Sequence, residues 1–349
     1  MDNMEKNYFL YTNEYVNDTY EFYNDTFGNS NVTDEFPNDN VSYAVEVVSM
    51  ILYTLTCVLG LPGNAFVIWI AGMKMKRTVN TIWFLNLAIA DFLCCLSLPF
   101  SIVNIALDYH WPYGNVLCKL IPSVIILNMF ASVFTLTLIS LDRFVLVIKP
   151  VWSQNNRRIS LAYTLCGIVW LMALFLSLPP LIYRETHYDI YTNTTECHYN
   201  YNTDNKRKIE NMVHITRFVF GFVIPFFIII MCYSLIALKV KSSHFAKSKK
   251  TLKIVLGVIV AFFICWLPYH ITGILIELST VIDPLVIALA YINSCLNPFL
   301  YVFMGHDFKE TVRHSLRHVL ESAFSEDLTR STIQSKGKSS RDENSDLHL

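Results

Sequence analysis

Long runs of uncharged, mostly apolar residues constrain this chain more than any other feature of its sequence. A helix needs about 20 mostly apolar residues to cross the hydrocarbon core of a bilayer. Seven such runs occur, at residues 47–73, 78–107 with only Asp91 interrupting, 120–141, 159–183, 218–238, 254–276 and 284–306. Charged residues make up only 16% of the chain, against about 25% in soluble domains. A soluble globular protein is therefore excluded, and an all-α membrane protein is predicted, built as a seven-transmembrane helix bundle.

The basic residues of the short loops predict the orientation of the spans, because cytoplasmic loops carry an excess of Lys and Arg. The loops after the first, third and fifth runs carry such an excess: Lys74, Lys76 and Arg77; Lys149, Arg157 and Arg158; and Lys239, Lys241, Lys247, Lys249, Lys250 and Lys253. We therefore expect a multi-pass protein of the cell membrane with an extracellular N-terminus and a cytoplasmic C-terminus. The first 46 residues are polar and acidic, so we expect no signal peptide and a first span that acts as its own insertion signal.

Composition divides the chain into four expected regions. These are an extracellular tail (1–43), the seven-span bundle (44–305), a short amphipathic eighth helix on the inner leaflet (306–320) and a cytoplasmic tail rich in Ser and Thr (321–349). The eighth helix is predicted because Phe308, Val312 and Leu316 form an apolar stripe beside the basic Arg313 and Arg317, a pattern typical of helices that lie on an anionic membrane surface.

The N-terminal tail holds nine acidic residues and one basic residue, with tyrosines among the acids. It is either a solvated, disordered segment or an electrostatic trap for a cationic protein ligand. Sulfation would deepen the field, with Tyr15, Tyr20 and Tyr23 as candidates. Asn-X-Ser/Thr acceptors for glycosylation, all in segments expected outside the cell, are Asn17, Asn24, Asn31, Asn40 and Asn193. Candidates for phosphorylation in the C-terminal tail are Ser325, Thr329, Ser331 and Thr332.

Strongly polar residues within the spans are costly and usually functional. Asp91 lies in the middle of the second span, at a depth where amide and hydroxyl side chains of other spans could reach it: Asn64, Ser132, Asn293 and Asn297. Such a group can be a hydrogen-bonded cluster that holds helices together or a hydrated cation site. We favour a sodium pocket and expect no cofactor other than Na⁺ as an allosteric ion.

Taken together, motif residues occur one set to a span and in order: Asn64; Asp91; Asp142-Arg143-Phe144; Trp170; Pro225 with Tyr233; Cys265-Trp266-Leu267-Pro268; and Asn297-Pro298-Phe299-Leu300-Tyr301. This set resembles the class A (rhodopsin-like) G protein-coupled receptors. One departure is Phe144, where the family usually has Tyr. The resemblance implies an activation switch, and its residues here are Asp142, Arg143, Tyr233, Trp266, Pro268, Asn297, Pro298 and Tyr301.

Other stretches narrow the resemblance. Residues 77–85, 110–114 and 149–155 look like the chemoattractant receptors for formyl peptides and complement anaphylatoxins. Residues 117–123, 127–134 and 323–332 are similar to receptors for the component 3a anaphylatoxin. Those receptors carry a very long second outer loop, whereas the loop here runs only from about Arg184 to Glu210. The acidic, tyrosine-rich N-terminal tail instead resembles that of the component 5a receptor.

The resemblance also implies a disulfide and a ligand site. Cys118 and Cys197 are the two cysteines expected outside the membrane, and the family pairs them. Anaphylatoxins are small cationic proteins that end in Arg. By resemblance, Arg184 and Arg217 would receive the carboxylate of that terminal Arg, Asp283 its guanidinium, and Tyr269 would add a hydrogen bond. Two positive charges and one negative charge leave this site with an expected excess of positive charge.

The expected function is that of a cell-surface receptor for a complement anaphylatoxin, most closely component 3a, acting in chemotaxis and inflammation. Expected partners are the anaphylatoxin, an inhibitory-type G protein that also drives calcium signalling, receptor kinases, arrestin and the lipid bilayer, with no nucleic acid. The alternatives are a receptor for component 5a or for formyl peptides. A transporter or channel would need repeated halves or a continuous polar pathway, and neither is found. No metalloprotease or serine hydrolase motif lies in the spans, so the chain is not expected to be an enzyme.

Overall fold

The structure is a computed structural model of the chain, and it describes residues 39–200, 206–241, 249–273, 279–304 and 313. The chain divides into Met1–Ser42, of which only residues 39–42 are described, and Tyr43–Leu349. Three groups of predicted modification sites lie outside the described residues: Asn17, Asn24 and Asn31; Tyr15, Tyr20 and Tyr23; and Ser325, Thr329, Ser331 and Thr332. The predicted helix 306–320 also lies outside them, apart from Arg313.

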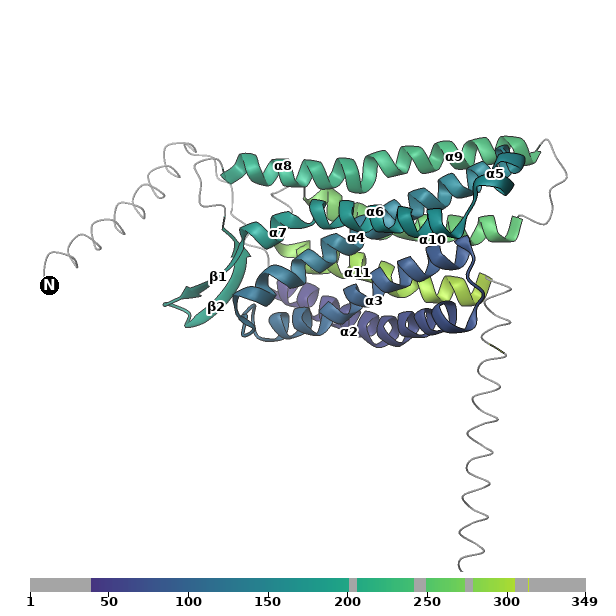
Figure 1. Ribbon diagram of the computed structural model, residues 1–349. Helices are drawn as coiled ribbons and strands as arrows, with labels where there is room; N and C mark the ends of the chain where they lie inside the picture. The colour runs from purple at the N-terminus through teal and green to yellow at the C-terminus, as the bar shows by residue number, and fades with distance from the viewer. Residues whose placement is uncertain (1–38, 201–205, 242–248, 274–278, 305–312, 314–349) are drawn as a thin grey trace, which may run out of the picture. The chain divides into compact units, whose positions relative to one another are not determined.

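Each predicted span falls on helix in the structure (Figure 1). In chain order, the helices are α2 (Asp39–Trp69) with η1 (Ile70–Lys74), α3 (Val79–Ala106), α4 (Gly114–Ile148), α5 (Pro150–Asn156), α6 (Ile159–Leu176) with α7 (Leu178–Tyr183), α8 (Lys206–Phe218) with η2 (Val219–Val223) and α9 (Ile224–Lys241), α10 (Lys249–Thr272) and α11 (Ser279–Met304). Figure 1 shows α8 and α9 continuing one another as a single rod.

The third span, α4, is the central element of the bundle. It packs against α3, α5, α6, α7, α9 and α10. Met129, Phe130, Ala131 and Val133 along its middle are fully buried. Helices at the edge instead point large apolar side chains outward, such as Phe175 of α6, which is 72% exposed. Outward-facing apolar residues on helices of this length are what a bilayer requires. The predicted all-α seven-span bundle is confirmed.

Close approach of the first span to its neighbours depends on a small residue. A Cβ at Gly60 of α2 would clash with the Sγ atom of Cys95 in α3. Small residues let spanning helices approach at backbone distance. Two cross-helix hydrogen bonds then fasten α2 to α11: Asn64 Nδ2 donates to the Ser294 carbonyl across 2.8 Å, and the Tyr53 hydroxyl donates to the Pro284 carbonyl across 3.1 Å.

The second outer loop contains a feature that the all-α prediction did not include. Strands β1 (Arg184–Asp189) and β2 (Thr194–Tyr199) form an antiparallel hairpin in which Arg184 pairs with Tyr199 and Thr186 with Cys197. Backbone polar groups outside the helices still need partners, and the hairpin provides them within the loop. The hairpin also places Arg184 and Tyr199, its first and last residues, side by side.

Candidate ligand site at the outer end of the bundle

A cavity of about 280 Å³ lies beneath the hairpin, between the helix ends on that side of the bundle, which we call the outer end after its predicted orientation. All four residues predicted to bind ligand line it, namely Arg184, Arg217, Tyr269 and Asp283. Further residues on its wall are Pro122, Ile125, Ile126, Tyr199, Glu210, His214, Ile287 and Ala290. The cavity is therefore apolar toward α4 and α11 and carries its charges and hydroxyls at a few positions, as small-ligand sites usually do.

Arg217, near the end of α8, is the most deeply buried charge of this cavity, with 5% of its surface exposed. Its Nη1 donates to the Tyr269 hydroxyl across 3.2 Å and its Nη2 to the Tyr199 hydroxyl across 3.3 Å. Its Nε has no hydrogen-bond partner within the described part of the chain. Both partners are neutral phenols, so the guanidinium is held in place without its charge being neutralised.

Arg184 enters the cavity from the hairpin. Its guanidinium carbon lies 4.8 Å from the centre of the Tyr199 ring, a cation–π arrangement. Its Nη1 approaches Cys197 Sγ at 3.7 Å. Burial acts to raise the pKa of the Tyr199 phenol, but the charges of Arg217 and Arg184 outweigh burial and hold that pKa below its usual value. Tyr199 thus joins the two arginines, and sequence reasoning missed it because only the hairpin register brings it there.

The acids of the cavity correct one expectation. Besides the half-buried Asp283 of α11, the half-buried Glu210 of α8 lines the same wall. The formal charges are therefore two positive and two negative, and the expected excess of positive charge is wrong. The sequence analysis did not identify Glu210, because it placed this residue at the end of the polar second outer loop. No motif around Glu210 indicated that it lies at the cavity. A balanced cavity suits a ligand end that carries one cation and one anion.

The predicted disulfide between Cys118 and Cys197 is confirmed, with the sulfur atoms 2.01 Å apart. It ties β2 to the outer end of α4. Two further contacts hold the hairpin over the cavity: the Trp111 N–H donates to the Thr195 carbonyl across 2.7 Å, and the Thr195 N–H donates to His110 Nδ1 across 3.0 Å. The hairpin is therefore a fixed roof, and Arg184 is positioned by covalent and backbone contacts.

The fifth span widens into the π-helical segment η2 between Arg217 and Pro225. Pro225 has no N–H, and its ring would clash with the carbonyl of Gly221, four residues earlier. The wider turn of η2 relieves that clash. A Cβ at the buried Gly221 would lie 2.9 Å from Met129 Cε of α4. The backbone of this turn therefore packs directly against the Met129 side chain. Such π-helical segments are frequent at functional sites, and this one sets how Arg217 faces the cavity.

A second polar cluster surrounds Asp91 in the bundle core, where Asp91 is fully buried. Asn297 Nδ2 donates to Asp91 Oδ2 across 2.6 Å. In the amide orientation that satisfies its neighbours, Asn128 Nδ2 donates to Asp91 Oδ1 across 3.2 Å and Asn128 Oδ1 accepts from the Ser294 hydroxyl across 3.0 Å. The sequence analysis did not single out Asn128 and Ser294. Both are polar residues within predicted spans, and their polarity is the signal that could have identified them.

The remaining residues of the predicted sodium pocket lie around this centre at different distances. In the same amide orientation, Asn128 Nδ2 also donates to Ser132 Oγ across 3.2 Å, and Asn64 is joined through the backbone of Ser294. The side chain of Asn293 makes no hydrogen bond within the described residues. The buried oxygens Asn64 Oδ1, Asn293 Oδ1 and Asn297 Oδ1 accept no hydrogen bond. Hard cations prefer oxygen ligands, and Asn297, one of the three residues with an unsatisfied oxygen, contacts Asp91, so the chemistry of this set fits a sodium ion.

Near the other end of the bundle, Asp142 and Arg143 close the predicted third span. Asp142 is bound mainly by Arg157, whose Nε and Nη2 lie 2.7 and 3.1 Å from its two oxygens. Arg143 Nη2 is farther away, at 3.7 Å. The Asn80 side-chain oxygen accepts from both arginines. Arg157 and Asn80 were not among the predicted switch residues, and only the packed helices show their role.

The other predicted switch residues lie on α9, α10 and α11. Trp266 of α10 is fully buried, and its ring centre lies 5.5 Å from that of Tyr269, one turn above it. Pro268 lies inside α10, Tyr233 is half-buried in α9, and Asn297 and Pro298 are buried in α11. Tyr301 belongs to α11, but its side chain is outside the described residues. A contact path therefore runs from Arg217 through Tyr269 to Trp266.

Among the described residues, five helices are long and apolar enough to cross a membrane, and Leu256–Thr272 is a shorter apolar helix. Residues 63–301 match the family model of the 7 transmembrane receptor (rhodopsin family), and the chain belongs to that family. It is therefore a multi-pass membrane protein of a receptor family and not an enzyme.

Individual relatives share nearly the whole length of the chain. It is 51% identical to the C3a anaphylatoxin chemotactic receptor of Oncorhynchus mykiss over 97% of this chain and 96% of that protein. It is 50% identical to the protein of the same name from Danio rerio, over 93% and 91% respectively. It is also 40% identical to C5a anaphylatoxin chemotactic receptor 1 of Oryctolagus cuniculus, over 93% and 95%.

Proposed function

We propose that this protein is a cell-surface receptor for a complement anaphylatoxin, component 3a, whose C-terminal Arg enters the outer cavity. One observation carries the proposal: two arginines converge in a cavity where neither forms an ion pair with a described carboxylate, since Arg217 is bonded to phenols and Arg184 lies against a ring. The 51% identity to a protein named as a C3a receptor, against 40% to one named as a C5a receptor, favours component 3a.

The charges of the cavity match the two charges of a terminal Arg. Its carboxylate would take the paired hydrogen bonds that a guanidinium offers, first from Arg217, whose Nε is free to donate. Its side chain would place a guanidinium near Asp283 or Glu210. The ligand end carries one anion and one cation, so each of its charges meets a group of opposite sign in the cavity.

Activation would follow from the contact path below the cavity. A ligand that pulls on Arg217 also changes the hydrogen bond to Tyr269, and the Tyr269 ring rests on Trp266. An agonist shifts a two-state equilibrium only if it binds one state better. Movement of α10 at Pro268 would then expose Arg143 to an inhibitory-type G protein, with calcium signalling, receptor kinases, arrestin and chemotaxis downstream.

The Asp91 cluster would hold Na⁺ in the inactive state. Asp91 supplies the negative charge, and the unsatisfied oxygens of Asn64, Asn293 and Asn297 supply further ligands. When bound, the ion contributes a positive charge that offsets the buried carboxylate. The residues themselves link α2, α3 and α11, so the cluster favours one packing of these three helices.

The orientation places the acidic N-terminal tail outside the cell, where its field would attract a cationic ligand. The proposed glycosylation site Asn193 suits this arrangement, because it is exposed in the turn of the hairpin at a positive φ of 57°. Asn40 lies in the first turn of α2. Sulfated tyrosines of the tail would strengthen the attraction, and phosphorylated residues of the C-terminal tail would recruit arrestin.

The proposal is tested by a G protein activation assay in transfected cells, with component 3a, component 5a and a formyl peptide compared at equal surface expression. We expect component 3a to activate at the lowest concentration and the formyl peptide not to activate. If component 5a activated at the lowest concentration instead, the proposed ligand would be wrong, but the assignment as an anaphylatoxin receptor would stand. A response to none of the three would overturn the anaphylatoxin assignment.

A further inference from the structure

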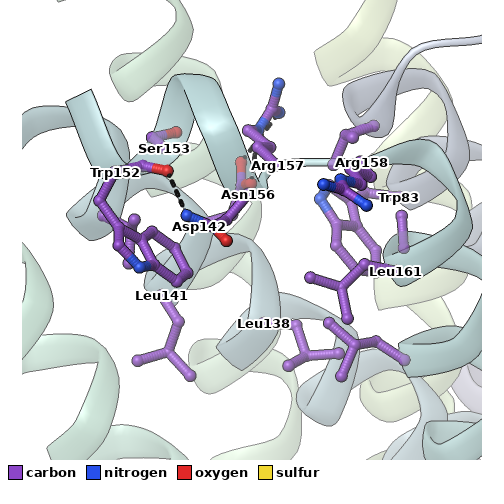
Figure 2. Close-up of a pocket in the computed structure, with 14 residues that line it drawn as sticks. Trp83, Leu138, Leu141, Asp142, Trp152, Ser153, Asn156, Arg157, Arg158 and Leu161 are labelled. Carbon is purple, nitrogen blue, oxygen red and sulfur yellow. Dashed lines mark hydrogen bonds and ion pairs between the residues drawn. The ribbon is translucent and has the colours of Figure 1, made fainter. Parts of the chain in front are cut away.

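A second cavity, of about 220 Å³, lies beside the Asp142 cluster (Figure 2). It is enclosed by α3, α4, α5 and α6, and most of its wall is apolar. Figure 2 shows Trp83 and Arg158 on one side of the cavity and Trp152 and Ser153 on the other. The switch residue Asp142 forms part of its wall, but the proposed receptor mechanism places no ligand in this cavity.

The rim of the cavity faces away from the bundle. Leu141, Trp152 and Leu161 line it and are 37%, 52% and 45% exposed. Exposed apolar side chains at the ends of membrane-spanning helices lie against lipid rather than water. The cavity is therefore open toward the bilayer, near the end of the bundle where basic loop residues gather.

Two buried polar atoms of the wall have no partner among the residues that the structure describes. Trp83 is 3% exposed and Ser153 is 2% exposed, yet neither Trp83 Nε1 nor Ser153 Oγ makes a hydrogen bond within the described residues. A buried donor without an acceptor is unfavourable and rare in folded proteins. The indole N–H can only donate, and none of the described residues provides the acceptor that it needs.

Arg158 adds a charge to this unsatisfied wall. Its guanidinium is exposed at the cavity and makes no hydrogen bond or ion pair with any described residue, whereas the adjacent Arg157 is bound to Asp142. Arg158 is also the N-cap residue of α6, and no side chain of its own caps that helix. The first-turn N–H groups of an 18-residue helix therefore add partial positive charge at the same place.

We propose that this cavity binds one anionic phospholipid, whose phosphate is held by Arg158 and the Trp83 N–H and whose acyl chain lies along the apolar wall. The volume supports part of a ligand only, since whole small-molecule sites usually measure about 300–1,000 Å³, and the rest of the lipid would remain in the bilayer. The cation is what selects an anionic headgroup over a neutral sterol, because a sterol hydroxyl leaves Arg158 without a counterion. This inference goes beyond the proposed receptor function and does not depend on which peptide binds outside.

The test uses the full-length receptor without agonist, in nanodiscs that contain equal amounts of phosphatidylglycerol, phosphatidylcholine, cholesterol and oleate. Native mass spectrometry then counts the lipids that the released receptor retains. We expect phosphatidylglycerol to be retained in preference to the other three. Arg158→Gln should weaken that retention about tenfold, as expected for the loss of a charged hydrogen bond.

Two matched variants make the test specific. Lys149→Gln removes one positive charge from the same loop, but Lys149 does not line the cavity, so retention should stay unchanged. Leu161→Trp narrows the exposed rim without altering charge and should lower retention as Arg158→Gln does. Equal retention of the anionic and zwitterionic phospholipids, preferential retention of cholesterol or oleate, or equal losses in Arg158→Gln and Lys149→Gln would each overturn the proposal.

Discussion

The two ends of the bundle each bury arginines, but they give them different partners. At the inner end, Arg157 binds both oxygens of Asp142, at 2.7 and 3.1 Å. In the outer cavity, Arg217 is 5% exposed and is bonded only to the hydroxyls of Tyr269 and Tyr199 among the described residues. The inner charge is therefore neutralised within the protein, whereas the outer charge is held by neutral groups.

This difference is the basis on which we propose a structural role for Arg157 and a binding role for Arg217. Burying a charge without a counterion is costly, and proteins tolerate that cost mainly where a function needs the charge. Asp91 is the acidic counterpart of Arg217, since it is fully buried and bonded to amide groups. We therefore propose that a ligand anion is the counterion of Arg217 and that a cation is the counterion of Asp91. Asp142 and Arg157 are already counterions of each other.

The largest expected effect is a difference in ligand affinity between variants of Arg217 and of Arg157. Arg217→Ala removes the guanidinium that receives the ligand carboxylate and should lower ligand affinity about 30-fold or more, because losing one partner of a buried charged pair costs about 2–5 kcal/mol. Arg157→Ala should leave ligand affinity unchanged, since Arg143 remains near Asp142. Equilibrium binding to membranes with equal receptor content measures both. Equal losses of ligand affinity in Arg217→Ala and Arg157→Ala would mean that the lack of a counterion does not mark the ligand-binding arginine.

Arg217→Lys is the conservative control for this prediction. Lysine keeps the positive charge but cannot offer the two parallel N–H donors of a guanidinium. We expect an affinity between that of the wild type and that of Arg217→Ala. If lysine restored full affinity, the cavity would recognise charge alone and not the planar geometry of a carboxylate.

The next effect extends the comparison to Asp91. Raising sodium should lower agonist affinity about fivefold or more, the lower end of typical coupling between sites, and Asp91→Asn should abolish this dependence and signal poorly. Ser97→Ala is a matched control, because Ser97 is buried in the same helix but bonds to Cys94 and Tyr291 instead. Sodium titrations of agonist binding test this, and a dependence that persists in Asp91→Asn would rule out the pocket.

The smallest effect concerns the neutral groups that hold Arg217. Tyr199→Phe removes one hydroxyl from the guanidinium and should lower ligand affinity about twofold to tenfold, which corresponds to about 0.5–1.5 kcal/mol for a neutral hydrogen bond. Tyr188→Phe, on the exposed face of the hairpin, should change nothing. Competition binding resolves the two. A loss in Tyr199→Phe as large as that in Arg217→Ala would show that the phenol contacts the ligand itself.

The apolar runs predicted the spans but not the ends of the helices. The third run begins at residue 120, whereas α4 begins at Gly114 and continues past Asp142 and Arg143 to Ile148. Polarity limits the part of a helix that lies in lipid, but a helix continues into the headgroup region as long as its backbone bonds are satisfied. The hairpin β1–β2 was missed for a related reason, because its six-residue strands carry no apolar alternation.

The candidate site was predictable where a residue belonged to a motif. Arg184, Arg217, Tyr269 and Asp283 came from the resemblance, and they line one cavity. Tyr199, Glu210, Asn128 and Asn80 were not found, because each acts through a cross-helix or hairpin contact that depends on rotation and register. A single sequence gives the depth of a polar residue in the membrane but not which neighbouring helix its side chain faces.

The central claim is that the outer cavity binds the terminal Arg of the ligand, and a double-mutant cycle tests it most directly. Intact component 3a and component 3a lacking its last Arg would each be measured on the wild type and on Asp283→Ala. We predict about a 30-fold or greater loss for either change alone and little further loss when both are present, because they remove the same contacts. Equal potency of the intact and trimmed ligands on the wild type, or losses that simply multiply, would contradict the assignment and leave recognition to the acidic N-terminal tail.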